Sequence, residues 1–289
     1  MAVKPLIGFI GQGFIGKNYA DDFVARGYEV VRYSLDPAHQ ENKDKIKDCD
    51  IVFIAVPTPT TPDGFDSSII REAIKLVGPQ KTVVIKSTIT PGLTELFQAE
   101  NPNLFVLHSP EFLSEATAKI DAAEPKRNII GLPVNNEEFQ KRAEVVMAIL
   151  PRAPYEKICG AREAEIIKYA RNCLGYVRVV FANLLYDLTT GLEADWATVR
   201  EAISADPDNG PTYMNPVHKS GRGAGGNCFI KDFAAFVELY KAHVDDPVGL
   251  AVLESNVKKN LELLTTTGKD LELVRGVYGH ENFTSHSKN

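Results

Sequence analysis

The chain has 289 residues, of which 44% are hydrophobic and 24% are charged, and its formal net charge is −6. This length suits a first domain of about 150 residues and a second domain, each with its own core. The mild acidity, together with the lack of any run near the roughly 18 apolar residues of a membrane span, argues against nucleic-acid and membrane partners, so we expect a cytoplasmic protein.

The first half of the chain alternates short apolar runs with amphipathic stretches. We expect strands at residues 6–10, 30–33, 51–56, 83–85, 105–107 and 128–131, and helices at residues 15–25, 67–76 and 136–150. Fully apolar strands separated by helical lengths are typical of a buried parallel sheet that is covered on both faces. The pattern predicts an α/β fold with a doubly wound parallel sheet, a Rossmann-like domain over residues 1–155.

The second half of the chain has a helical pattern. Residues 161–190 contain no proline and predict one helix much longer than average. Shorter helices are expected at residues 196–204, 229–243 and 248–264. We therefore expect an all-helical dimerisation domain over residues 156–278, which the long helix connects to the first domain and through which a homodimer forms. A polar tail follows over residues 279–289.

The first strand leads directly into Gly11-x-Gly13-x-x-Gly16, which opens the first helix. In this context the glycines permit a tight turn and a close approach of the backbone to a pyrophosphate, and the helix N-terminus favours the phosphate charge. We expect Gly11, Gly13, Phe14, Ile15 and Gly16 to bind a dinucleotide.

The sequence indicates less clearly which residue would bind the ribose of this dinucleotide. The usual acidic position at the end of the second strand falls near Ser34, and Asp36 lies two residues later. A serine tolerates a 2′-phosphate, and Arg32, His39 and Lys43 lie nearby in the sequence. Ser34 and Asp36 are the candidate cofactor residues, and the sequence favours NAD while leaving NADP open.

Three further strands end in compact polar motifs. These are Val56-Pro57-Thr58-Pro59, Lys86-Ser87-Thr88-Ile89-Thr90-Pro91-Gly92 and His108-Ser109-Pro110-Glu111-Phe112-Leu113-Ser114-Glu115. Ligands of open parallel sheets bind outside the carboxyl ends of the strands, so we expect all three motifs to face one crevice. The alternative is that their proline, threonine and glycine residues are ordinary turn formers.

Cys228 stands in a loop built from glycine, Gly221-Arg222-Gly223-Ala224-Gly225-Gly226-Asn227-Cys228, and Asp232 follows it by four residues. The helix expected after this loop would favour a thiolate at its N-terminus. The alternative, a small buried hydrophobe, suits Cys49, Cys159 and Cys173 better. The cysteines form no Cys-x-x-Cys pair, so we expect reduced thiols and no metal site.

Together with the earlier motifs, the cysteine loop resembles the UDP-glucose/GDP-mannose dehydrogenase family of nucleotide-sugar dehydrogenases. The resemblance extends from residue 4 to about residue 265, with its motifs in the family's order. It implies that a nucleotide sugar is oxidised from a C6 alcohol to a carboxylate in two NAD-dependent hydride transfers, through a cysteine thiohemiacetal and thioester. A UDP-glucose-like substrate is favoured.

The resemblance also implies roles for individual residues. Cys228 matches the family's nucleophile, and Asp232 matches the carboxylate that positions the catalytic water. Lys168 and Asn172 match the pair that stabilises the oxyanion, and their spacing of four places them on one helix face as possible donors. The alternative is that Lys168 pairs with Glu165, one turn earlier on a solvated face.

Thr88 and Glu111 match the family's residues for water binding and thioester hydrolysis. Further cofactor contacts are implied for Val56, Pro57, Thr58, Thr88 and Glu115, and substrate contacts for Glu111, Phe112, Leu113, Lys168, Asn172, Tyr213, Arg222 and Gly225. As a base on water, Glu111 would need a desolvated site that raises its pKa.

The chain departs from the family pattern in several places. Full-length members carry a third domain, and this chain ends about where that domain would begin; we expect a short form, a fragment, or a nucleotide held by another subunit. Ala224 replaces a usual aromatic residue, Ile230 replaces a proline or polar residue, and residues 213–220 form a longer segment. The arginine that the family donates across the dimer is not evident at residues 208–210, and Arg222 is a candidate replacement.

Two other functions fit parts of the sequence. A β-hydroxyacid dehydrogenase has a similar length, the same two-domain plan and a helix-borne lysine and asparagine, but needs no cysteine. A non-catalytic cofactor-binding subunit would retain the glycine motif without turnover.

Overall fold

The computed structural model describes residues 4–279, which form two compact units. Unit 1 contains the chain up to Thr58 and residues Asp66–Lys168; unit 2 contains Pro59–Phe65 and the chain from Tyr169 onward. Most of the expected polar tail, residues 280–289, lies outside the described residues. The two units are described separately below.

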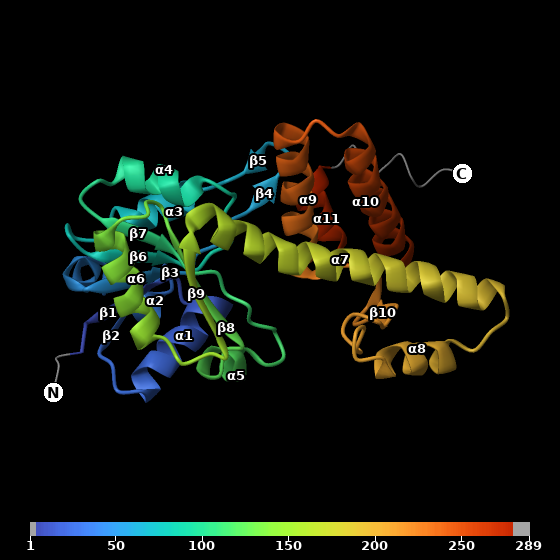
Figure 1. Cartoon of the computed structure of the whole chain (residues 1–289), viewed down its shortest axis with the longest axis horizontal. Coiled ribbons are helices and arrows are strands. Elements are labelled where there is room, and N and C mark those ends of the chain that lie inside the picture. The colour runs from blue at the N-terminus through green and yellow to red at the C-terminus, as the bar shows by residue number, and fades with distance from the viewer. Residues whose placement is uncertain (1–3, 280–289) are drawn as a thin grey trace. The chain divides into compact units, whose positions relative to one another are not determined.

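Unit 1 is built around one sheet with the strand order β2-β1-β3-β6-β7-β8-β9 (Figure 1). The strands are β1 (Ile7–Ile10), β2 (Val30–Tyr33), β3 (Ile51–Ile54), β6 (Thr82–Ile85), β7 (Phe105–His108), β8 (Arg127–Leu132) and β9 (Tyr155–Gly160). All neighbours pair in parallel except β7 and β8, which are antiparallel. The predicted doubly wound sheet is therefore confirmed, and it is mostly rather than wholly parallel.

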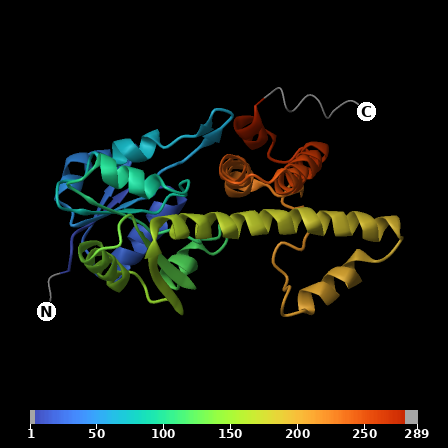
Figure 2. The same ribbon diagram turned by 45° about the horizontal axis from the view of Figure 1, so that its top comes forward.

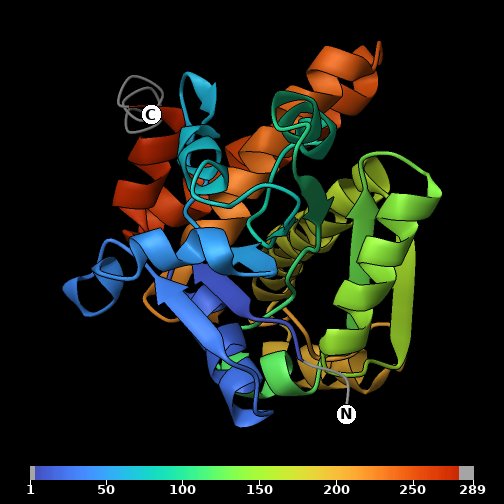
Figure 3. The ribbon, with the colours of Figure 1, turned by 90° about the vertical axis from the view of Figure 1, so that its left-hand side faces the viewer.

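Helices cover both faces of this sheet. They are α1 (Phe14–Ala25), α2 (Pro37–Gln40), the 3₁₀ helix η1 (Lys43–Asp48), α3 (Ser68–Ile74), α4 (Leu93–Glu100), α5 (Ala118–Ala123) and α6 (Glu137–Ile149). Figures 1 and 3 show α1 and α5 on one side of the sheet and α3 and α4 on the other. Helix α4 was not predicted, because the residues Thr90-Pro91-Gly92 indicate a turn. In the structure, Gly92 has a φ of +95° and is the N-cap of this helix.

Apolar strand residues and one face of α1 form the core of unit 1. Phe9 of β1 stacks on Phe53 of β3 with ring centroids 4.9 Å apart, and Phe23 of α1 meets both rings. The same core extends to α5 and α6, where Phe139 contacts Phe105 edge to face. This packing holds the loop between β1 and α1 at the carboxyl edge of the strands.

Unit 2 is helical, as predicted. Helix α7 (Ala161–Gly191) matches the expected long helix, and the division between the units falls within it. The other elements are α8 (Trp196–Ala205), α9 (Gly226–His243), α10 (Pro247–Thr267), α11 (Leu271–Tyr278) and the short hairpins β4 (Thr60–Thr61) with β5 (Gly64–Phe65), and β10 (Val217–His218) with β11 (Gly221–Arg222). Figures 1 and 2 show α9, α10 and α11 together on one side of α7 and α8 on its other side.

An aromatic stack joins α7 to α9 in the core of unit 2. The rings of Tyr176 and Phe233 are parallel, with centroids 3.9 Å apart, and both side chains are fully buried. Helix α10 begins at Pro247, where the Asp246 carboxylate accepts hydrogen bonds from two first-turn amides, and it ends at Gly268 with φ of +69°. Local capping and apolar packing thus both define the helices around the cysteine loop.

We expect Gly16→Ala to lower the free energy of unfolding by about 1–3 kcal/mol, although alanine is the better helix former. The added Cβ would lie 1.9 Å from the carbonyl oxygen of Gly11, so the turn would have to shift. Gly13→Ala is the matched control, because its Cβ would meet no described heavy atom within 4 Å. Urea denaturation measures both variants, and equal losses would contradict the steric explanation.

Candidate active site

The loop between β1 and α1 has the backbone geometry that a bound pyrophosphate needs. Gly11 has φ of +90°, and a Cβ there would lie 2.2 Å from the carbonyl oxygen of Ala55. Gly13 is the N-cap of α1, and in this described segment no side chain caps the helix and no acidic residue occupies its first turn. The first amides of α1 are therefore left for an anionic ligand, which fits a dinucleotide. Phe14 and Ile15 form the start of this helix.

The two candidate ribose residues lie just after β2. The Ser34 hydroxyl accepts a hydrogen bond from the backbone N–H of Asp36 at 3.3 Å. The Asp36 carboxylate caps α2 by accepting from the N–H of Ala38 at 2.9 Å. Arg32, considered as a phosphate partner, instead pairs with Asp21 at 2.6 Å. The exposed carboxylate of Asp36 is the acidic group available at this strand end.

The loops after β3 and β6 are joined at the carboxyl edge of the sheet. The Ser87 hydroxyl accepts from the N–H of Val56 at 2.9 Å and donates to its carbonyl oxygen at 2.7 Å. Thr58 and Thr88 in these loops are buried. The expectation that strand-end motifs come together is thus met for these two loops, and Ser87, which received no role from the sequence, is the residue that joins them.

The third strand-end motif is tied to α7 by a buried ion pair. Lys168 Nζ lies 2.5 Å from Glu111 Oε1 and also donates to the Glu111 carbonyl oxygen at 2.8 Å. The other carboxylate oxygen of Glu111 accepts from the N–H of Leu113 at 2.8 Å. Both side chains are almost fully buried, so two of the predicted catalytic residues meet in a site shielded from water.

Lys168 does not pair with Glu165, the alternative that its spacing allowed. The fully buried Glu165 accepts from the N–H groups of Gly92 and Thr94, at 2.7 and 2.9 Å, and from the Thr94 hydroxyl at 2.6 Å. Burial raises the pKa of Glu165, although these donors act in the opposite direction. Glu165 therefore fixes the start of α4, which leaves Lys168 to Glu111.

A second buried lysine, which the sequence left without a role, lies close to this pair. Lys86 Nζ donates to the Ser109 hydroxyl at 3.0 Å and lies 4.4 Å from the centre of the Tyr19 ring. Burial lowers the pKa of Lys86 to about 7; the Glu111 charge opposes this shift and the Lys168 charge adds to it. Its presence in the Lys86-Ser87-Thr88 motif was the only signal that could have identified it.

In unit 2, Asn172 and Asp232 form the second predicted pair. Asn172 Nδ2 donates to Asp232 Oδ2 at 2.6 Å, and Lys231 Nζ lies 2.6 Å from Asp232 Oδ1. The side chains of Asn172 and Asp232 are buried. Asn172 is one turn after Lys168 in α7, so successive turns of this helix carry one member of each pair.

Cys228 differs from the other cysteines in its surroundings. It lies in the first turn of α9 and is exposed, whereas Cys49 and Cys173 are buried. Burial raises the pKa of Cys49 to about 12, and burial also raises the pKa values of Cys159 and Cys173. The thiolate is therefore disfavoured at three cysteines, while Cys228 has the exposure and helix position that suit a nucleophile.

The remaining substrate candidates divide between the two units. In unit 1, Phe112 contacts the Arg127 guanidinium at 3.8 Å, Leu113 is buried, and Glu115 is exposed in the loop after β7. In unit 2, Tyr213 packs edge to face on Phe229 at 5.2 Å, and Gly225 is the N-cap of α9.

Arg222 lies in the same loop of unit 2 as Gly225. Its guanidinium donates to Asn183 Oδ1 at 2.8 Å and to Asp187 Oδ1 at 2.6 Å. The arginine proposed for substrate is thus held on α7 in this structure.

Among residues 4–279, no three His, Cys, Asp or Glu side chains gather as metal ligands would. No helix in that range is both long and apolar enough to cross a bilayer.

The sequence profiles of two domains of one known family match the chain. The NAD binding domain of the UDP-glucose/GDP-mannose dehydrogenase family matches residues 37–150, and the central domain of the same family matches residues 162–258. UDP-glucose 6-dehydrogenase AglM of Haloferax volcanii is 28% identical over 83% of this chain and 66% of its own length. This chain spans 66%, 47% and 34% of the length of three curated relatives, and thus less than two thirds of each.

Two solved structures resemble this chain in fold. A UDP-glucose dehydrogenase from Pyrobaculum islandicum superposes with a TM-score of 0.76 and 27% identity, over 92% of this chain and 71% of that one. A 3-hydroxyisobutyrate dehydrogenase from Mycobacterium tuberculosis superposes with a TM-score of 0.69 over 96% of this chain and 99% of that one. At 15% identity, the second likeness shows a shared fold alone.

Replacement of Lys86 should change how stability depends on pH. With a pKa of about 7 in the fold, Lys86 carries fewer protons than in the unfolded chain, where its pKa is about 10.4. The free energy of unfolding should therefore rise with pH above about 7, and Lys86→Met should lose up to roughly 1 kcal/mol of this rise per pH unit.

Denaturation at several pH values measures the difference between the two proteins. Lys75→Met removes an exposed lysine that pairs with Glu72 and serves as the control. Parallel stability curves for wild type and Lys86→Met would show that Lys86 is not neutralised by burial.

Proposed function

We propose that this chain, which belongs to the UDP-glucose/GDP-mannose dehydrogenase family, is a nucleotide-sugar 6-dehydrogenase that oxidises a C6 alcohol to a carboxylate, with a UDP-glucose-like sugar favoured. The observation that carries the proposal is Cys228, the exposed thiol in the first turn of α9. Oxidation of an alcohol as far as a carboxylate needs a nucleophile that adds to the intermediate aldehyde.

The reaction balances in four steps. The alcohol loses a hydride and a proton and becomes an aldehyde. The Cys228 thiolate then adds to the carbonyl carbon, and the resulting oxyanion takes up a proton to form a thiohemiacetal. Loss of a second hydride and the hydroxyl proton gives a thioester, and water then releases the carboxylate and restores the thiol. When bound, NAD would supply the oxidising chemistry as the acceptor of each of the two hydrides, so that two NAD molecules would be needed per sugar.

The two buried pairs supply the polar groups for these steps. We assign Lys168 and Asn172 to the oxyanion that develops as the thiolate adds, because each is a donor held by a carboxylate partner. Asp232 is assigned to position the hydrolytic water, and Glu111 to act on that water as the base. Thr88, buried in the strand-end loop, is assigned to water binding.

The glycine loop of unit 1 is the proposed cofactor site. Gly11, Gly13 and Gly16 bring the backbone to the pyrophosphate, and the first amides of α1 hold its charge. The exposed carboxylate after β2 favours NAD over NADP. The further proposed cofactor residues are Phe14, Ile15, Ser34, Asp36, Val56, Pro57, Thr58 and Glu115, and the proposed substrate residues are Phe112, Leu113, Tyr213, Arg222 and Gly225.

A second candidate is a β-hydroxyacid dehydrogenase, a class whose two-domain fold this chain shares with the mycobacterial enzyme. That chemistry ends after one hydride transfer and needs no thiol. The exposed Cys228 therefore favours the nucleotide-sugar reaction. A non-catalytic cofactor-binding subunit, which would keep the glycine loop of unit 1 without turnover, is the third candidate.

Cys228→Ser should abolish the formation of carboxylate. With NAD and UDP-glucose, we expect turnover to fall roughly 1000-fold or more, because the aldehyde can no longer be captured. Cys159→Ser is the matched control, and both variants should bind NAD as the wild type does. Carboxylate formed by Cys228→Ser at the wild-type rate would refute the covalent mechanism, and NAD binding without reduction across UDP and GDP sugars would favour the non-catalytic subunit.

The surface of α7 supports the proposed homodimer. Apolar side chains are exposed on this helix at intervals of three or four residues: Leu174, Val177, Phe181, Leu184 and Leu188. Residues with this spacing form one continuous stripe along a helix. A continuous exposed apolar stripe is typical of a protein–protein interface. A second copy related by a twofold axis would bury this stripe against its own.

Phe181→Asp should convert the dimer to a monomer. The substitution places a charge at the centre of the stripe, where a dimer interface would have to bury it. Val134→Asp, in unit 1, changes a side chain of similar exposure outside α7 and should leave the dimer intact. Sedimentation equilibrium measures the masses, and a monomeric wild type would contradict the proposal.

A further inference from the structure

The glycine loop of unit 2, residues 221–228, includes β11 and the start of α9 and ends at Cys228. Gly223 and Gly226 have φ of +92° and +79°, values that other residues rarely adopt. A chain so rich in glycine loses much conformational entropy when it is fixed in one arrangement. Its order must therefore come from contacts with neighbouring elements.

Asn260 of α10 makes the central contact with this loop. Its Oδ1 accepts from the N–H of Ala224 at 2.6 Å, and its Nδ2 donates to the carbonyl oxygen of Ala224 at 2.9 Å. One side chain thus satisfies both backbone polar groups of a single loop residue, as a neighbouring strand would. Asn260 and Ala224 are each 1% exposed, so water cannot replace these bonds without opening the loop.

Asn260 is itself held in place by the core of unit 2. Its side chain hydrogen-bonds to Tyr176, whose ring stacks on Phe233 of α9. The same asparagine thus connects the loop to the aromatic contact between α7 and α9. Movement of the Asn260 side chain would disturb three elements at once.

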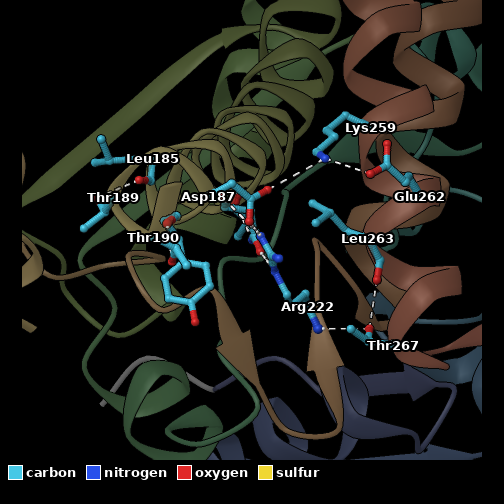
Figure 4. A network of polar contacts seen from close by, with 12 residues as sticks. Leu185, Asp187, Thr189, Thr190, Arg222, Lys259, Glu262, Leu263 and Thr267 are labelled. Atoms are coloured by element: carbon cyan, nitrogen blue, oxygen red, sulfur yellow. Dashed lines mark hydrogen bonds and ion pairs between the residues drawn. The ribbon is translucent and has the colours of Figure 1, made fainter. Parts of the chain in front are cut away.

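Other tethers hold the ends of the loop. At the start of the loop, the Arg222 guanidinium donates to the Asp187 carboxylate of α7, and Lys259 Nζ lies 3.8 Å from the same carboxylate. The backbone N–H of Arg222 donates to the Thr267 hydroxyl at 3.1 Å (Figure 4). At the end, Asp270 Oδ2 accepts from the N–H of Gly226 at 2.8 Å. Asn260 binds between these two points.

We propose that Asn260 is a positioning residue that holds the glycine loop so that Cys228 presents its thiol from the first turn of α9. The inference rests on the proposed function of Cys228 as the nucleophile. The Asn260 amide carries its donor and its acceptor on separate atoms, so it meets the Ala224 N–H and C=O at the same time. A carboxylate at this position would accept from the N–H and repel the carbonyl oxygen.

Asn260→Asp and Asn260→Ser test the proposal. With NAD and UDP-glucose, we expect kcat to fall about 10- to 100-fold in both variants while KM for NAD stays unchanged, because the thiol is misplaced and the cofactor site is not. Alkylation of Cys228 by iodoacetamide, followed by peptide mass spectrometry across pH, should slow on the order of 10-fold as the thiol leaves the helix N-terminus. Thermal unfolding identifies any variant that fails to fold.

Asn256→Asp is the matched control, since Asn256 lies one turn earlier on α10 and donates to the carbonyl oxygen of Val252 in its own helix. Asn260 variants that match this control in alkylation rate and kcat would overturn the inference.

Alkylation needs no turnover, so slowed alkylation together with an active Cys228→Ser would refute the nucleophile and leave the positioning role standing. Should neither Asn260 variant fold, hydrogen exchange of the wild type decides: the Ala224 amide should be protected, and rapid exchange would overturn the proposal.

Discussion

The buried ion pair between Lys168 and Glu111 is the interaction on which the carboxyl edge of unit 1 depends. Two charges removed from water cost several kcal/mol each, and only close contact with full hydrogen bonding offsets that cost. The pair meets this condition, since Lys168 donates to two oxygens of Glu111 and the N–H of Leu113 completes the carboxylate. If helix α7 and the loop after β7 moved apart, Lys168 and Glu111 would each be left as a buried charge without its partner.

Glu165 adds a second connection from the same helix. It lies one turn before Lys168 and caps α4, so successive side chains of α7 connect the helix to two different loops of the sheet. The pattern continues into unit 2, where Asn172 holds Asp232 and Tyr176 stacks on Phe233. These buried side chains of α7 have hydrogen-bond or packing partners, and such support helps to hold the loop that carries the exposed Cys228 in one position.

Much of the fold could be predicted because its signals are local. The apolar runs at β1 and β3, the spacing of Gly11, Gly13 and Gly16, and the long pattern of α7 each depend on contiguous residues. Strand β9 could not be predicted, because its exposed and half-buried residues lack an apolar run, and α4 was concealed by the turn residues before it. The candidate residues of the active site came from motifs. Lys86 and Asn260 received no role, and Glu165 was considered only as a surface partner of Lys168, because a single buried polar residue carries no periodic signal.

The sequence by itself determined the class of the fold, and it identified the glycine loop of unit 1 and Cys228 as candidates, since hydrophobic period, glycine spacing and cysteine context are properties of neighbouring residues. The tertiary structure alone decided which groups pair. Lys168 could reach Glu165 within its own helix, yet it binds Glu111, 57 residues away, and Asn172 binds Asp232, 60 residues away. The physical reason is burial: once packing removes these groups from water, each must take the partner that the fold brings within hydrogen-bond distance.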